Sequence, residues 1–159
     1  MVNTVTAVLG GASNRDLLNL TIQNATNSQT ITIDRMVVSW VGALANPRLR
    51  RIQINGTNVW NGNLATPADA DITNFTLNTT PTIYPIDFLR FSGSMVGATI
   101  TIQFVMTDGS RKTAAVFPAS NNYNFTVNST GRATGSNIQR TIRADYNAFT
   151  GRVINYTEQ

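Results

Sequence analysis

Any chemistry in this chain of 159 residues must be done without histidine or cysteine, because the sequence contains neither. Histidine is the commonest general base and metal ligand, and cysteine is the usual thiol nucleophile. Carboxylates, hydroxyls and a single lysine, Lys112, remain. Without cysteine there is no disulfide framework either. We therefore expect a protein that is not an enzyme and that binds no cofactor.

One group of carboxylates could bind a metal ion. Asp69 and Asp71 lie on one side of an extended chain, with Asn74 nearby, and oxygens at this spacing could bind Ca²⁺. The set is far short of the roughly six to eight oxygens that Ca²⁺ takes. A solvated loop that leads into a strand is the other interpretation, and we predict no metal site.

Other carboxylates lie in expected strands, at Asp34, Asp87 and Asp145, where a suitably spaced pair could hydrolyse a glycosidic bond. Each has an arginine close by in the sequence: Arg35, Arg90 and Arg143. We therefore expect ion pairs between adjacent residues or across strands, and no catalytic residues.

Arginines and aromatic rings gather around one expected hairpin. Arg50 and its neighbours could contact phosphates while Trp60 stacks on a base, and Trp40 with Trp60 could form part of a carbohydrate-stacking face. The alternatives are a solvated edge that discourages aggregation between strands, and aromatic side chains packed in the core. We predict no specific nucleic-acid partner. The candidate ligand-facing residues are Trp60, Tyr84, Arg48 and Arg51.

Asparagine followed two residues later by serine or threonine recurs along the chain, which is the acceptor pattern for N-glycosylation of an exported protein. A chain rich in these residues also produces the pattern by chance, and Asn55 lies in a tight turn that disfavours modification. The candidate glycosylation sites are Asn19, Asn24, Asn74, Asn78, Asn124, Asn128 and Asn155.

Charged residues make up 13% of the chain, about half of the usual share, and the formal net charge is +4. A surface wetted by neutral amides and hydroxyls is common in exported β-proteins, and the excess of arginine gives a weak general affinity for anionic polymers. The first residues are too polar for a signal peptide, and no apolar window is long enough to span a membrane. We expect a secreted, extracellular or cell-surface protein whose export signal is not in this sequence.

Short β-branched segments separated by turn residues predict an all-β chain. Residues 30–41 form the most prominent segment, and Asn55-Gly56 and Asp108-Gly109 are strong hairpin signals. Residues 18–23 are expected to pair antiparallel with 30–41. The expected strands cover residues 2–9, 18–23, 30–41, 49–54, 57–60, 70–77, 86–91, 98–106, 112–117, 121–128, 138–146 and 152–156.

Strands at this close, regular spacing predict an antiparallel, immunoglobulin-like β-sandwich with multiple hairpins and little helix. No linker is long or charged enough to indicate a second domain, so we expect residues 1–159 to form one domain. Residues 1–12 are candidates for an exchanged or flexible N-terminal strand, and residues 137–159 for a terminal hairpin.

Residues 18–24, 30–40 and 49–62 resemble the globular heads of type IV pilin-like proteins, the prepilin and pseudopilin group, and residues 140–147 with 150–156 resemble a terminal hairpin of some members. This resemblance implies a filament subunit. Family members also carry an amino-terminal apolar helix, preceded by a basic leader that a peptidase removes, and no such segment is present here. The helix could have been removed, a separate hydrophobic-helix chain could supply it, or the two could share only a sandwich pattern.

Three functions remain open. The first is a non-catalytic structural subunit of a pilin-like extracellular filament or surface assembly, acting by self-association through strand edges or complementary patches. The second is an adhesive module that binds a glycan or a protein through loops around Trp60 and Tyr84. The third is a virion or other shell protein.

Overall fold

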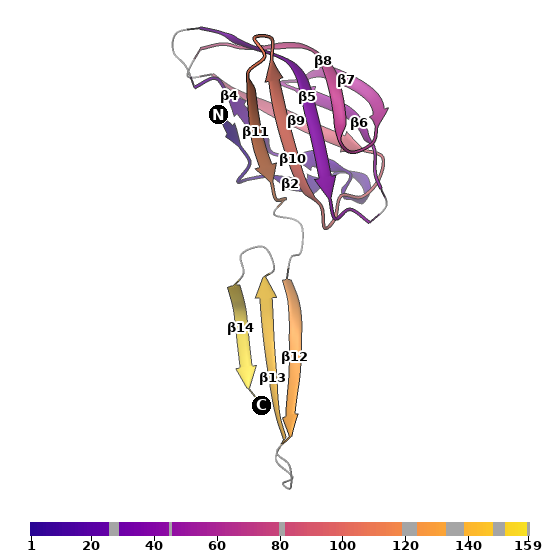
Figure 1. The fold of residues 1–159 in the computed structure, drawn as a ribbon, viewed down its shortest axis with the longest axis vertical. Coiled ribbons are helices and arrows are strands. Elements are labelled where there is room, and N and C mark those ends of the chain that lie inside the picture. Colours follow the sequence, from indigo (N-terminus) through magenta and orange to yellow (C-terminus); the bar gives the residue numbers. More distant parts are fainter. Residues whose placement is uncertain are drawn as a thin grey trace. The chain divides into compact units, whose positions relative to one another are not determined.

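The structure is a computed structural model that describes residues 1–25, 29–44, 46–79, 82–118, 124–132, 139–147 and 152–158. The chain forms two compact units, Met1–Asn121 and Asn122–Gln159 (Figure 1). This division differs from the single domain expected for residues 1–159. No long or charged linker separates the two units, and both consist of short strands, so the prediction placed no boundary between them.

The predicted all-β, antiparallel sandwich is confirmed. The first unit contains one short 3₁₀ helix, η1 (Ala12–Asn14), and strands β1 (Val2–Asn3), β2 (Val8–Gly10), β3 (Asp16–Leu18), β4 (Leu20–Gln23), β5 (Ile31–Val41), β6 (Leu49–Ile54), β7 (Thr57–Leu64), β8 (Ala68–Leu77), β9 (Ile83–Phe91), β10 (Thr99–Met106) and β11 (Arg111–Val116). The second unit contains β12 (Asn124–Arg132), β13 (Gln139–Asn147) and β14 (Arg152–Glu158).

The resemblance to type IV pilin-like heads is wrong at the level of the fold. Those heads combine a sheet with a long N-terminal helix, whereas the described residues contain no α-helix at all. The quoted segments match because hairpin patterns of alternating residues are shared by many unrelated β-proteins.

No helix in the described parts of the chain has the length and apolar character needed to cross a membrane.

Strand β9 organises the larger sheet of the first unit, here called sheet A. One edge of β9 pairs with β4 and β3, and the other edge pairs with β6, which continues to β7. The expected strand 18–23 is broken at Asn19, whose φ is +61°. Leu18 ends β3, which begins two residues before the expected strand, and residues 20–23 form β4. The N-terminal segment is also broken, and β1 and β2 pair within this chain with β4 and β3.

The second sheet, sheet B, has the order β11-β10-β5-β8. Strand β5 therefore lies between β10 and β8, and the prediction that residues 30–41 pair with residues 18–23 is wrong. The connection between β4 and β5 crosses from one sheet to the other, so neighbours in the sequence belong to opposite layers. Such a crossing leaves no signature in the alternation of either strand.

The core lies between the two sheets. Ile100, Ile102 and Phe104 of β10 are buried, as their alternation predicts. Aromatic rings join the layers: Trp40 of β5 meets Phe91 of β9 edge to face at 5.0 Å between centroids. Edge-to-face pairs of this kind add about 0.5–1.5 kcal/mol beyond the burial of area. Strands β9 and β5 thus contact each other across the core and hold the two sheets together.

The second unit is a three-stranded antiparallel sheet, sheet C, with the order β12-β13-β14 (Figure 1). The predicted terminal hairpin is present as β13 and β14. Val127, Ala144 and Tyr156 form one row across the three strands, and Asn128, Arg143 and Thr157 form the next. Because successive side chains point to opposite faces, these two rows lie on different faces of sheet C.

The hairpin between β6 and β7 turns at Asn55-Gly56, where φ is +49° and +75°. We expect Gly56→Val to lower the free energy of unfolding by about 1–2 kcal/mol, because a β-branched residue resists this left-handed conformation. A Cβ at Gly56 would meet no atom within 4 Å, so the loss would come from backbone strain and not from a clash. Chemical unfolding measures it. Thr57→Val, at the next exposed strand position, is the control, and equal stability of the two variants would contradict the assigned turn.

The hairpin between β10 and β11 is closed by Asp108, whose carboxylate accepts a hydrogen bond from the Ser110 N–H at 2.8 Å. Hydrogen bonds from the Ser110 hydroxyl and backbone hold the pKa of Asp108 below its ordinary value. The stabilisation is therefore present above the unfolded pKa of about 4 and is lost as the pH falls through the lower folded pKa. In urea unfolding, the native chain should have a higher free energy of unfolding than Asp108→Ala near neutral pH, and this difference should become smaller in acid. A difference in the free energy of unfolding that is the same at every pH would contradict the role of the Asp108 carboxylate in the turn.

Candidate functional site

The solvent face of sheet A carries two consecutive arginines because of a β-bulge in β6. Leu49 pairs with Phe91 of β9 and Arg51 pairs with the preceding Arg90, so Arg50 is an extra residue. Leu49 and Ile52 are both fully buried while Arg50 and Arg51 are both exposed. Strict alternation would have turned one arginine into the core, where an unpaired charge is very costly. The bulge instead places both guanidinium groups on the same face.

A row of polar side chains crosses this face from β7 through β6 and β9 to β3, in the order Asn61, Arg51, Arg90 and Asp16. Arg90 donates from Nε and Nη2 to the two oxygens of Asp16, both at 2.8 Å. This pairing raises the pKa of Arg90 above its ordinary value. Arg51 donates from Nε only to the neutral Oδ1 of Asn61, at 3.0 Å, so the positive charge of Arg51 is not compensated there.

A pocket of about 320 Å³ opens among these side chains. Its lining residues are Arg15, Arg50, Arg51, Asn61, Arg90, Phe91 and Ser92, here called the arginine pocket. No carboxylate lines it. The Nε of Arg15 is buried and has no hydrogen-bond partner among the described residues. The pocket offers the N–H donors of several guanidinium groups, which suit an anion, together with the amide of Asn61 and the hydroxyl of Ser92.

The predicted ligand-facing residues do not form one site. Arg51 lies in the arginine pocket, whereas Arg48 donates from Nε and Nη2 to the backbone oxygen of Asn63 and lies outside the pocket lining. Trp60 is half-buried and packs against the core. Tyr84 is only 8% exposed, so its ring is not available for stacking on a ligand.

The proposed metal ligands and catalytic carboxylates do not gather into one site, although Asp34 and Asp69 line one recess of sheet B together with Arg35. Asp69 pairs with Arg35 at 3.2 Å across β8 and β5, on the exposed face of sheet B. Asp87 accepts a hydrogen bond from the N–H of Gly56 at 2.7 Å. Within the described ranges, no three acidic residues gather closely enough to hold a metal ion.

The expected ion pairs between sequence neighbours are only partly present. Arg35 pairs with Asp69 instead of Asp34, and Arg90 pairs with Asp16 instead of Asp87. Asp34 and Asp87 are the extra residues of bulges in β5 and β9, where the simple alternation on which the prediction relied is interrupted. The pair that is two apart, Arg143 and Asp145, does approach, at 3.9 Å.

Exposure divides the candidate glycosylation sites. Asn19, Asn74, Asn78 and Asn128 are exposed, whereas Asn24 is 1% exposed and its amide donates to the backbone oxygen of Gln29 at 2.8 Å. A glycan on Asn24 would have to break that buried contact. The side chains of the remaining two candidates, Asn124 and Asn155, lie outside the described part of the structure.

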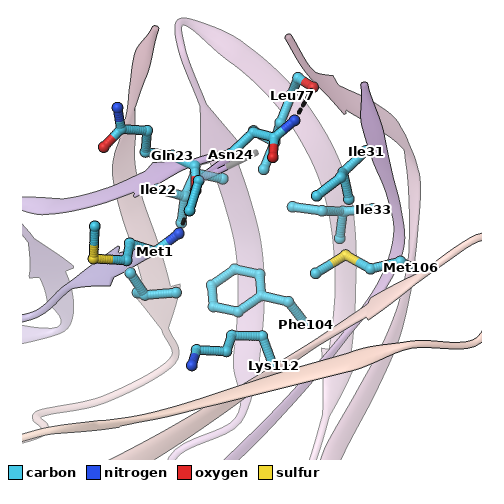
Figure 2. A pocket seen from close by; sticks show the side chains of 12 residues that line it. Met1, Ile22, Gln23, Asn24, Ile31, Ile33, Leu77, Phe104, Met106 and Lys112 are labelled. Carbon is cyan, nitrogen blue, oxygen red and sulfur yellow. Dashed lines mark hydrogen bonds between the residues drawn. The ribbon is translucent and has the colours of Figure 1, made fainter. Parts of the chain in front are cut away.

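A second pocket, of about 270 Å³, opens between the sheets at the end where β1 and β4 face β10 and β11 (Figure 2). Phe104 and Lys112, which are register partners on β10 and β11, lie side by side along it. Its other lining residues are Met1, Val2, Ile22, Gln23, Asn24, Ala25, Ile31, Ile33, Leu77 and Met106. The lining is mostly apolar, and its one charged side chain is that of Lys112.

Sheet C presents a different kind of surface. Val153 and Tyr156 are 57% and 60% exposed, and Val127 and Ile142 of the same face are also exposed. The register places them with Ala144 on one face. This face is here called the apolar face of sheet C. The register also places two charged residues, Arg140 and Glu158, on it, both towards one end.

Sequence reasoning missed most of the arginine pocket. Arg15 and Arg90 are distant in sequence from β6, and their contribution depends on strand pairing that the sequence does not reveal. One signal was present. Residues 49–52 read apolar, charged, charged, apolar, a pattern that can keep both apolar residues buried only if the strand contains a bulge.

No protein-family model matches the chain, and neither the curated proteins nor the solved structures contain a significant match.

The Asp16 carboxylate is 5% exposed and Arg90 is 32% exposed, so this ion pair is partly shielded from water. We expect Asp16→Asn to lower the free energy of unfolding by about 2 kcal/mol, because a charged hydrogen-bond partner is lost while Arg90 stays in place. Asp69→Asn removes the exposed pair with Arg35 and should cost less than about 0.5 kcal/mol. Urea unfolding compares the two variants. Similar losses would show that the Asp16 pair is no stronger than a surface pair.

Proposed function

We propose that this chain is a non-catalytic structural subunit of an extracellular or cell-surface assembly, and that its copies associate through the apolar face of sheet C. The exposure of this apolar face carries the proposal. The low share of charged residues, 13%, and the lack of histidine and cysteine support a scaffolding role in an exported protein.

Sheet C is amphipathic in a way that selects one face for burial. On its polar face, Thr126 donates to Asp145 at 2.6 Å and the hydroxyls of Thr130 and Thr141 lie 3.4 Å apart. These groups are satisfied in water. The other face carries Val, Ile, Ala and Tyr side chains, and a stable sheet normally packs such a face against a second layer.

A second copy of sheet C suits this face. The register places the charged residues of this face, Arg140 and Glu158, towards the end beyond Ile142. Stacking the faces around Ala144 and Val153 keeps the contact among apolar side chains and avoids the desolvation penalty of an unpaired charge. Two sheets packed in this way lie about 10 Å apart, as in the layers of a sandwich. The resulting contact is two-fold and joins copies in pairs, so a filament would need a further contact between non-identical surfaces.

Sedimentation of the full chain over a range of concentrations tests the proposal. We expect the native chain to self-associate, and Val153→Asp to weaken association by at least about tenfold, since a charge would then be buried in the contact. Val153 is exposed, as is Thr157, the position of the control variant described next, so neither substitution should unfold the sheet.

The control is Thr157→Asp, which adds the same charge to the polar face of the same strand and should leave association unchanged. A native chain that stays monomeric at its highest soluble concentration would contradict the proposal. Equal weakening by the two variants would show that net charge, and not the apolar face, governs association.

A further inference from the structure

The arginine pocket lies in the first unit and shares no residue with the proposed contact of sheet C. We infer that it binds the acidic group of an anionic saccharide, a sulfated or carboxylated sugar. The inference does not depend on the proposed function.

The positive charges in the pocket are only partly compensated by acidic side chains. Arg51 and Arg90 are direct register partners on adjacent strands, and like charges directly opposite each other destabilise a sheet. Asp16 compensates Arg90, but within the described residues no carboxylate pairs with Arg50 or Arg51. A bound anion would offset this repulsion, so the arrangement costs stability when empty and gains it when occupied.

The donors in the pocket suit a planar or tetrahedral oxyanion. Guanidinium groups bind carboxylates and sulfates through paired N–H groups, and Arg50 and Arg51 emerge together from the bulge. The buried Nε of Arg15 has no acceptor among the described residues, and an unsatisfied buried donor costs free energy. A ligand oxygen that reached this nitrogen would recover that energy.

Neutral groups beside the arginines favour a sugar as the carrier of the acid. Asn61 contributes an amide, and Ser92 contributes a hydroxyl whose oxygen already accepts from the N–H of Arg48 at 2.9 Å, which leaves its own proton to donate. Amides and hydroxyls of this kind bind the hydroxyl groups of a sugar. The volume of about 320 Å³ falls at the lower end of the range for small-molecule pockets.

Nucleic acid fits less well, because binding of single strands relies on exposed aromatic rings that stack on bases. The one aromatic residue in the lining is Phe91, which is buried in the core against Trp40. Phe88 lies nearby, but the guanidinium of Arg90 covers its ring at 4.7 Å. The lining therefore offers charge and neutral hydrogen bonds without a stacking surface.

Calorimetric titration of the full chain at low salt tests the inference, with a sulfated disaccharide and a uronic-acid disaccharide as probes. We expect at least one of them to bind, and Arg51→Gln to weaken that binding by about tenfold or more. Arg111→Gln is the matched control, since it removes the same charge from an exposed strand of sheet B and should leave binding unchanged. Thermal unfolding verifies that both variants fold.

Three further ligands separate the alternatives: a neutral disaccharide, sodium sulfate and an oligothymidylate. Failure of the neutral sugar to bind supports the need for an acid. The inference is overturned if neither acidic disaccharide binds, if Arg51→Gln and Arg111→Gln behave alike, if sulfate binds as tightly as the sugars, or if the oligonucleotide binds more tightly than they do.

Discussion

The pairing of β9 on both of its edges is the constraint on which the first unit depends. Strands β3 and β4 share one edge of β9 and β6 occupies the other, so β9 fixes the register of each. Its inner face sends Phe91 to Trp40 across the core, and its outer face holds Arg90 against Asp16. One strand thus sets both the packing between the layers and the position of the charged row. A shift of one residue would exchange these two faces.

The bulge at Arg50 shows how the core imposes structure on the surface. Leu49 and Ile52 can both be buried only if two residues between them point outward, and the energy of burying both outweighs the cost of one disrupted ladder position. The surface consequence is a concentration of guanidinium groups with few acids nearby. Sheet C presents a different arrangement: the described side chains at the centre of one face are apolar, and the register places the charged residues Arg140 and Glu158 towards one end of that face. The two units therefore differ in the kind of surface that their described residues expose, charged in the first and apolar in the second.

Local rules predicted the fold class, the hairpin at Asn55-Gly56 and the inward face of β10, because each depends on residues close together in the sequence. These local rules could not predict which distant segments pair with each other. Asp16 and Arg90 are 74 positions apart, and the placement of β4 and β5 in different sheets depends on a crossing between layers. The resemblance to pilin-like heads failed for a related reason, since hairpin patterns specify local structure and not the family.

We propose that the apolar face of sheet C is half of a contact between copies. Because the chain has no cysteine, a single introduced thiol reports on one position without interference. Ala144 lies on the central strand within the apolar face, and Thr141 lies on the same strand within the polar face. Treatment of Ala144→Cys and Thr141→Cys with a short thiol-specific cross-linker should trap covalent dimers of the first and leave the second monomeric. Equal trapping of both, or none of Ala144→Cys, would contradict the account.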